Sequence, residues 1–120
     1  MSYRNLKVWQ RSMGLAESLY DASSHFPSDE KFGLTAQLRR CAVSVPSNIA
    51  EGYGRNNPGS FAYFLSVVMG SLKKAETQLL LAQRFHMLGV AETNEILDEA
   101  DEIGRMLLTL IRKAERDASK

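Results

Sequence analysis

The chain has 120 residues and a mass of 13.4 kDa, the size of one typical domain and too short for two separate cores. Hydrophobic residues make up 44% and charged residues 24%, an ordinary globular composition that excludes a disordered chain. The 15 Lys and Arg residues nearly balance the 14 Asp and Glu residues. The net charge of +1 excludes a whole-molecule attraction to nucleic acid or to anionic membranes.

Apolar residues spaced three and four apart predict a first helix over residues 5–24, ended by the Phe26-Pro27 pair. Its expected core face consists of Leu6, Trp9, Met13, Ala16 and Tyr20. A second helix is expected over residues 29–52, with Ser28 as its N-cap and a glycine-rich turn as its end. Its expected core face consists of Leu34, Leu38, Cys41, Val45 and Ile49.

Asn57 followed by Pro58 predicts the start of a third helix over residues 58–88, with Gly89 as its stop. Its expected core face consists of Phe61, Leu65, Val68, Leu72, Ala75, Leu79, Ala82 and His86. A fourth helix is expected over residues 92–116, with acids in its first half and basic residues near its end, as the helix dipole favours. Its expected core face consists of Ile96, Ala100, Ile103, Leu107, Leu110 and Ala114.

No segment alternates with a period of two, and the joins between helices are short. The sequence therefore predicts an all-α fold, an antiparallel up-down four-helix bundle in which residues 1–120 form a single domain. Pro46 lies inside the second helix, where it removes a backbone donor and crowds the carbonyl of Ala42. We therefore expect the second helix to be kinked at Pro46.

A polar stripe, made of Arg40, Ser44, Asn48 and Glu51, runs beside the apolar face of the second helix. One interpretation is a hydrogen-bond network that satisfies freed carbonyls or fixes the register of helices or subunits. The other is a recognition surface. The spacing alone leaves both open.

Groups for catalysis or metal binding are sparse. Neither His25 nor His86 has a Glu three residues before it, so the di-iron pattern of helical bundles is missing, and Cys41 is the only cysteine. Cys41 lies on the apolar face of its helix, so we expect a buried, inert thiol and no internal disulfide, which fits a reducing compartment. We expect no catalytic residues, no metal, no cofactor and no small-molecule substrate.

The glycine-rich run over residues 51–60 lacks the preceding strand and the Lys-Ser/Thr pair of a phosphate loop. We expect a tight turn that needs glycine for positive φ. A weaker alternative is that Arg55 and the free amides of the next helix hold an anion.

Basic residues form a few local clusters that are either solvated faces or, gathered around a symmetry axis, a positive patch. The candidate contacts to nucleic acid or anions are Arg39, Arg55, Lys73, Lys74, Arg112 and Lys113.

Surplus apolar residues bear on assembly. Residues 61–69 and 79–81 are apolar on more than one side, and Val8, Leu15 and Leu19 form a second stripe on the first helix. This surplus indicates self-association. The alternative is that the third helix is central and well covered.

The start of the chain, MSYRNLKVWQR, carries charges where a secretory signal needs an apolar run. The longest charge-free run, residues 56–72, is too short and polar to span a bilayer. We therefore expect a cytoplasmic protein that makes no contact with a membrane.

Several motifs together resemble one family. They are Leu6-Lys7-Val8-Trp9, then Phe26-Pro27 with Glu30-Lys31-Phe32-Gly33-Leu34-Thr35, then Gln37-Leu38-Arg39-Arg40 through Ser44-Val45-Pro46-Ser47-Asn48-Ile49-Ala50-Glu51-Gly52, and finally Gly70-Ser71-Leu72 with Glu76-Thr77. Over nearly the whole chain, this pattern resembles the four-helix-bundle family of 23S rRNA intervening-sequence proteins. The chain carries Lys74 where many members have Glu.

The resemblance implies a ring-like homopentamer. The family is named after genes within inserts of bacterial large-subunit rRNA genes, and a related, strongly basic branch serves diversity-generating retroelements by binding a reverse transcriptase and nucleic acid. By analogy, the structural or assembly signature of this chain is Arg40, Ser44, Pro46, Asn48, Glu51 and Gly52.

Two hypotheses from different classes follow. The first is a non-enzymatic homo-oligomer, a pentamer, that acts as a scaffold or adaptor. The second is a nucleic-acid-binding accessory protein for RNA or DNA, acting with a reverse transcriptase or rRNA, whose affinity falls steeply with salt.

Overall fold

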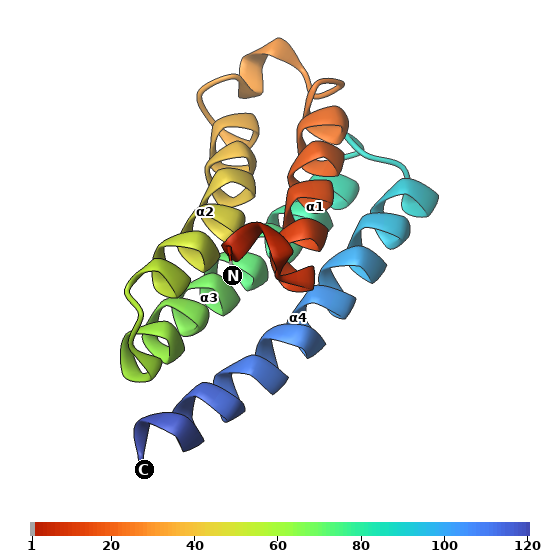
Figure 1. The fold of residues 1–120 in the computed structure, drawn as a ribbon. Helices are drawn as coiled ribbons and strands as arrows, with labels where there is room; N and C mark the ends of the chain where they lie inside the picture. Colours follow the sequence, from red (N-terminus) through yellow and green to blue (C-terminus); the bar gives the residue numbers. More distant parts are fainter. Residues whose placement is uncertain (1) are drawn as a thin grey trace.

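The computed structural model describes residues 2–120 and contains four α-helices joined by short turns (Figure 1). These are α1 (Lys7–Ser23), α2 (Leu34–Gly54), α3 (Pro58–Arg84) and α4 (Val90–Ala118). Two short 3-10 turns, Tyr3–Asn5 and Ser28–Glu30, precede α1 and α2. Residues 2–120 contain no strand, so the predicted all-α class is confirmed.

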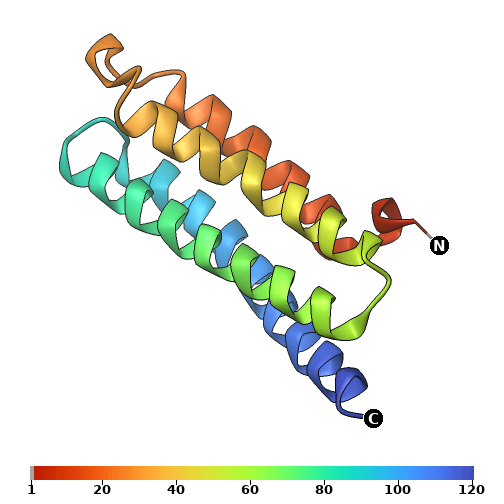
Figure 2. The same cartoon turned by 90° about the vertical axis from the view of Figure 1, so that its left-hand side faces the viewer.

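The helices form an elongated antiparallel bundle with extents of 50 × 23 × 21 Å. Consecutive helices pack side by side, and α1 also packs on α4 (Figure 2). Within residues 2–120 the diagonal pairs α1/α3 and α2/α4 make no comparable contact. The predicted up-down four-helix bundle is therefore confirmed. Its core lies along the axis that all four helices share.

The predicted core faces of the last three helices are confirmed at almost every position. Each helix supplies fully buried side chains, among them Leu38, Ile49, Leu65, Leu72, Leu79 and Leu107. Two positions of α3's predicted face differ, since Phe61 is half-buried and His86 is exposed.

The predicted core face of α1 is wrong at Met13 and Tyr20, which are each 42% exposed, while the other three predicted residues pack against the core half-buried. The stripe of Val8, Leu15 and Leu19, expected as surplus apolar surface, is fully buried in the core. The true core face contains Ser12, which a pattern of apolar residues cannot anticipate. The Ser12 hydroxyl donates to the carbonyl of Val8 at 2.7 Å, so its burial leaves no unpaired polar group.

The start of α2 lies five residues later than predicted. Ser28 opens a separate 3-10 turn and does not cap α2. The cap comes from the carboxylate of Glu30, which accepts the backbone N–H of Leu34 at 2.9 Å. The bounds of α1 and α4 match the prediction more closely, since each of these helices begins and ends within two residues of its predicted range.

The turns after α2 and α3 are closed by residues other than glycine. His86 has φ 61°, and the N–H groups of His86 and Met87 donate to the carbonyls of Gln83 and Ala82, a Schellman ending that stops α3 at Arg84 rather than at 88. After α2, Asn56 has φ 54°, and its N–H donates to the carbonyl of Tyr53 at 3.2 Å. The predicted tight turn between α2 and α3 is confirmed. Among the described residues no glycine has a positive φ, so the predicted need for glycine in that turn is wrong.

Gly52 permits a close approach of α2 and α3. A Cβ built on it would lie 2.5 Å from the Cβ of Phe64 and 3.3 Å from the ring of Phe61. Pro46 is also buried, and α2 continues through it as one helix. The kink at Pro46 stays a prediction.

None of the helices in residues 2–120 combines the length and the apolar character that a membrane span requires.

Candidate functional site

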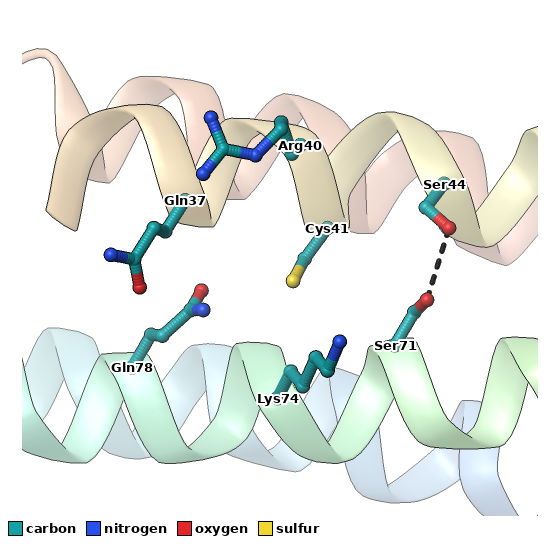
Figure 3. Close-up of a pocket in the computed structure, with 7 residues that line it drawn as sticks. All are labelled: Gln37, Arg40, Cys41, Ser44, Ser71, Lys74 and Gln78. Carbon is teal, nitrogen blue, oxygen red and sulfur yellow. Dashed lines mark hydrogen bonds between the residues drawn. The ribbon is translucent and has the colours of Figure 1, made fainter. Parts of the chain in front are cut away.

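A polar groove of about 480 Å³ runs between α2 and α3, and we call it the α2–α3 groove (Figure 3). Its lining residues are Gln37, Arg40, Cys41, Ser44, Ser71, Lys74 and Gln78. Since the two helices are antiparallel, residues pair across it in opposite order. Gln37 lies opposite Gln78 at one end, and Ser44 lies opposite Ser71 at the other (Figure 3).

A hydrogen-bond chain ties the two walls of the groove together. The hydroxyls of Ser44 and Ser71 lie 3.0 Å apart. The Asn48 amide donates both to the Ser44 hydroxyl, at 3.0 Å, and to the Ser44 carbonyl, at 2.9 Å. The network therefore links the two helices. None of these hydrogen bonds reaches the carbonyl of Ala42, which is the one that Pro46 leaves without its helical donor.

Arg40 and Lys74 give the groove its charge. Arg40 comes from α2 and Lys74 from α3, and no carboxylate lines the groove. Among the residues that the structure describes, neither side chain has an ion-pair partner. Two unpaired cations with polar neighbours make the groove an anion-attracting surface.

Cys41 lies at the base of the groove and is 7% exposed. Burial raises the pKa of the Cys41 thiol above its ordinary value, although Lys74, a hydrogen bond with Gln78 and Arg40 each act to lower it. The thiol therefore stays protonated near neutral pH, where it is a weak nucleophile. The predicted burial of Cys41 is confirmed.

We expect Cys41 to react with a disulfide reagent at least about tenfold more slowly in the folded chain than in guanidinium chloride, because the thiolate is the nucleophile. Replacing Lys74 by Gln should slow the folded-state reaction further, since Lys74 lowers the thiol pKa. Equal rates in folded and denatured protein would show that burial does not control this thiol.

The structure brings together only part of the predicted polar stripe. Arg40, Ser44 and Asn48 meet at or beside the groove. Glu51 lies further along α2 and pairs with Arg55 at 2.7 Å, on the surface. Gly52 belongs to the helix contact with α3 rather than to the groove.

The six candidate anion contacts do not form one patch. Lys73 pairs with Glu76 at 3.2 Å, and Lys113 pairs with Asp117 at 3.0 Å. The Arg39 guanidinium lies 4.6 Å from the centre of the Tyr20 ring and donates to the Ser23 hydroxyl. Arg55 pairs with Glu51, and Arg112 lies near the far end of α4. Of the six, Lys74 alone lines the α2–α3 groove.

The start of α3 is already capped. The Asn57 side chain accepts the backbone N–H of Ser60 at 3.0 Å, so it occupies the place where an anion would bind this helix end. Arg55, the other part of that predicted site, is held by Glu51.

Groups that could hold a metal are not assembled. Residues 2–120 contain no group of three or more His, Cys, Asp or Glu side chains placed for a metal ion. His25 and His86 are both exposed, at the ends of α1 and α3.

Three groove residues, Gln37, Ser71 and Gln78, are not among the predicted site residues. A signal for the two on α3 exists, since Ser71, Lys74 and Gln78 recur at spacings of three and four and form a polar stripe. What the pattern of one helix cannot supply is which stripe on a neighbouring helix faces it.

Comparisons with known proteins agree with this fold. The sequence profile of the family described as "23S rRNA-intervening sequence protein" matches residues 4–109. A solved structure of a protein of unknown function from Bacteroides thetaiotaomicron, described as from the S23 ribosomal protein family, is similar with a TM-score of 0.80 and 21% identity. The similarity covers 87% of this chain and 97% of that chain, and at this identity it concerns the fold alone. No curated protein matches. Because the family profile spans most of the chain, the chain belongs to the 23S rRNA-intervening sequence protein family.

Proposed function

We propose that the chain is a non-enzymatic, cytoplasmic scaffold or adaptor that assembles into a closed homo-oligomeric ring. The observation that carries this proposal is the presence of two separate exposed apolar surfaces on one small bundle. Single exposed apolar side chains are normal, but contiguous sets of them mark contact surfaces.

The first surface lies across α1 and α2, and we call it the α1–α2 surface. Met13, Tyr20 and Val43 are 42%, 42% and 52% exposed. Tyr20, Ala36 and Val43 line one shallow depression, together with the polar side chains of Arg39, Arg40, Ser44, Ser47 and Asn48. Arg39 lies over the Tyr20 ring, where its stem adds to the apolar area. No carboxylate lines this depression.

The second surface is the outward side of α3, which we call the α3 surface. Tyr63 and Val67 lie near the start of α3, and Leu81 and the C-cap residue Phe85 lie near its end on the same side. All four are exposed, and the exposed Lys74 and Thr77 lie between the two pairs. The core of the bundle already occupies the opposite side of α3, through Leu65, Val68, Leu72 and Leu79. The α3 surface is therefore surplus to the needs of one bundle.

Two different apolar surfaces on one chain suit a head-to-tail contact. In such a contact, one surface of each copy meets the other surface of the next copy, and the assembly closes into a ring when the rotation between copies closes. The number of five copies rests on the family resemblance.

The scaffold role is favoured over nucleic-acid binding because most of the candidate cations already interact with an acid or an aromatic ring of the same chain. Arg55, Lys73 and Lys113 form ion pairs, and Arg39 packs on Tyr20. Phosphate contacts need free Lys and Arg side chains gathered along one surface.

Val43→Asp tests the assembly. It places a carboxylate in the α1–α2 surface, and burying that charge without a partner disfavours association strongly. We expect the variant to keep its helical circular dichroism and to fall to the monomer mass in native mass spectrometry.

Val90→Asp is the matched control. Val90 is 60% exposed and lies at the start of α4, outside both surfaces, where the helix dipole favours an acid. The control should retain the mass of the unmodified protein. If Val43→Asp assembles as Val90→Asp does, the α1–α2 surface is not a subunit contact.

A further inference from the structure

We propose that the α2–α3 groove binds a small phosphate monoester that also carries a hydroxyl group, such as a phosphorylated polyol. This site goes beyond the scaffold role and does not depend on it. The inference rests on three features of the groove: its unpaired cations, its oriented hydroxyls and one buried acceptor atom without a partner.

The charges select an anion. Arg40 and Lys74 stand on opposite walls, and the seven lining residues include no carboxylate to neutralise them. Elsewhere on the bundle, cations such as Arg55 and Lys113 have an acid one helical turn away. An Arg fork and a Lys ammonium together suit a phosphate group, which offers several charged oxygens.

The hydroxyls add a donor. Asn48 donates a hydrogen bond to the Ser44 hydroxyl, so the Ser44 O–H can donate in turn to the Ser71 hydroxyl, 3.0 Å away. The Ser71 O–H is then free to donate to an oxygen of a ligand in the groove. In Figure 3, Ser71 and Lys74 rise from α3 toward the same space. The network that joins the helices thereby orients a donor toward the bound anion.

The Gln78 side chain has an acceptor atom that a hydrogen-bond donor on the ligand would satisfy. Its Oε1 is buried and, among the described residues, has no hydrogen-bond partner. A buried acceptor without a partner is unfavourable, and an ionised carboxylate or a phosphodiester has no hydrogen to offer it. A hydroxyl on the ligand would supply one once the Gln78 amide turns toward the groove, since its oxygen is closed to solvent in the unliganded chain. This feature favours a hydroxylated phosphate monoester over an acidic side chain from a second copy.

The size of the groove agrees with this ligand. A volume of about 480 Å³ exceeds what a lone phosphate fills and falls within the range of small-molecule sites. Three of its lining residues, Gln37, Arg40 and Lys74, are exposed, so the site is accessible in the single chain.

The test uses glycerol 3-phosphate as the probe on the full chain, followed by amide shifts in two-dimensional NMR at constant ionic strength. We expect saturable shifts centred on Ser44, Ser71 and Gln78. Methyl phosphate, which lacks a free hydroxyl, should bind more weakly, and glycerol should not bind. Linear shifts without saturation, or equal affinity for the two phosphates, would overturn the proposal.

Variants locate the site. Arg40→Gln and Lys74→Gln should each weaken binding by about tenfold or more, since each removes a charge-assisted hydrogen bond. Arg112→Gln removes an exposed cation far along α4 and should leave the affinity unchanged. Equal losses in all three variants would show a general charge effect and contradict a groove site.

Native mass spectrometry of the same variants separates this site from the assembly. We expect Lys74→Gln to keep the mass of the unmodified protein while losing the ligand; Arg40→Gln is used for ligand binding only, because Arg40 also lines the depression of the α1–α2 surface. If Lys74→Gln instead loses assembly, the groove is a subunit contact and the ligand proposal fails. If the unmodified protein is a monomer yet binds the probe, the site stands and the scaffold proposal fails.

Discussion

Replacing Gly52 by alanine is expected to destabilise the fold by about 1–3 kcal/mol, the usual cost of overpacking a close contact. The new methyl group would lie 2.5 Å from the Cβ of Phe64, an atom fixed to the α3 backbone, so α2 and α3 would have to move apart. The better helix propensity of alanine offsets only about 1 kcal/mol. Urea unfolding at a fixed protein concentration measures the difference.

Gly54→Ala is the matched control for this prediction. Gly54 lies two residues later in the same helix, is exposed, and has no atom within 4 Å of a built Cβ. Alanine there should leave the stability unchanged or raise it slightly, because it gains helix propensity without a clash. If the two variants unfold at the same urea concentration, the close approach at Gly52 does not limit the packing of α2 on α3.

Leu107→Ala should cost about 2–5 kcal/mol, the range for truncating a buried leucine and leaving a cavity. Leu107 is 0% exposed and lies in the core between α4 and its neighbours. The adjacent Leu108 is 43% exposed, so Leu108→Ala removes the same atoms from the surface and should cost much less. Both are read from urea unfolding. Similar losses for the two variants would contradict the assignment of α4's core face.

The bundle itself could be predicted because in three of the four helices the apolar residues at helical spacing are the ones that the structure buries. The acid-rich face of α4 leaves only one side for Ile96, Ile103 and Leu107, so the predicted face is the observed one. On α1 the spacing of apolar residues does not decide the core face, because two apolar stripes both have helical spacing. There the decision depends on Ser12, whose burial is possible because its hydroxyl bonds within its own helix.

Helix ends were harder to predict because side chains outside the usual signals close them. Glu30 caps α2 from within a preceding 3-10 turn, and His86 adopts a left-handed conformation that usually belongs to glycine or asparagine. Gly52 shows the reverse case. Its glycine is required by the approach of Phe64 and not by backbone conformation, and sequence alone does not distinguish these reasons.

The sequence predicted the α2 wall of the groove but not the α3 wall. The spacing of Arg40, Ser44 and Asn48 correctly placed three polar groups on one face of α2. Its opposite wall depends on the register between two helices, which the contact of Ser44 with Ser71 sets. Glu51 lies on the same stripe but too far along α2, and its local partner Arg55 holds it at the surface.

The central claim is that the chain assembles into a ring, and native mass spectrometry of the unmodified protein, purified gently at low salt, tests it most directly. The account predicts a species near five protomers, about 67 kDa, or five times the chain mass of 13.4 kDa. The same spectrum reports any co-purifying nucleic acid as additional mass, which would favour the accessory-protein hypothesis. A bare species of 13.4 kDa would contradict the account, because the two apolar surfaces would then have no partner.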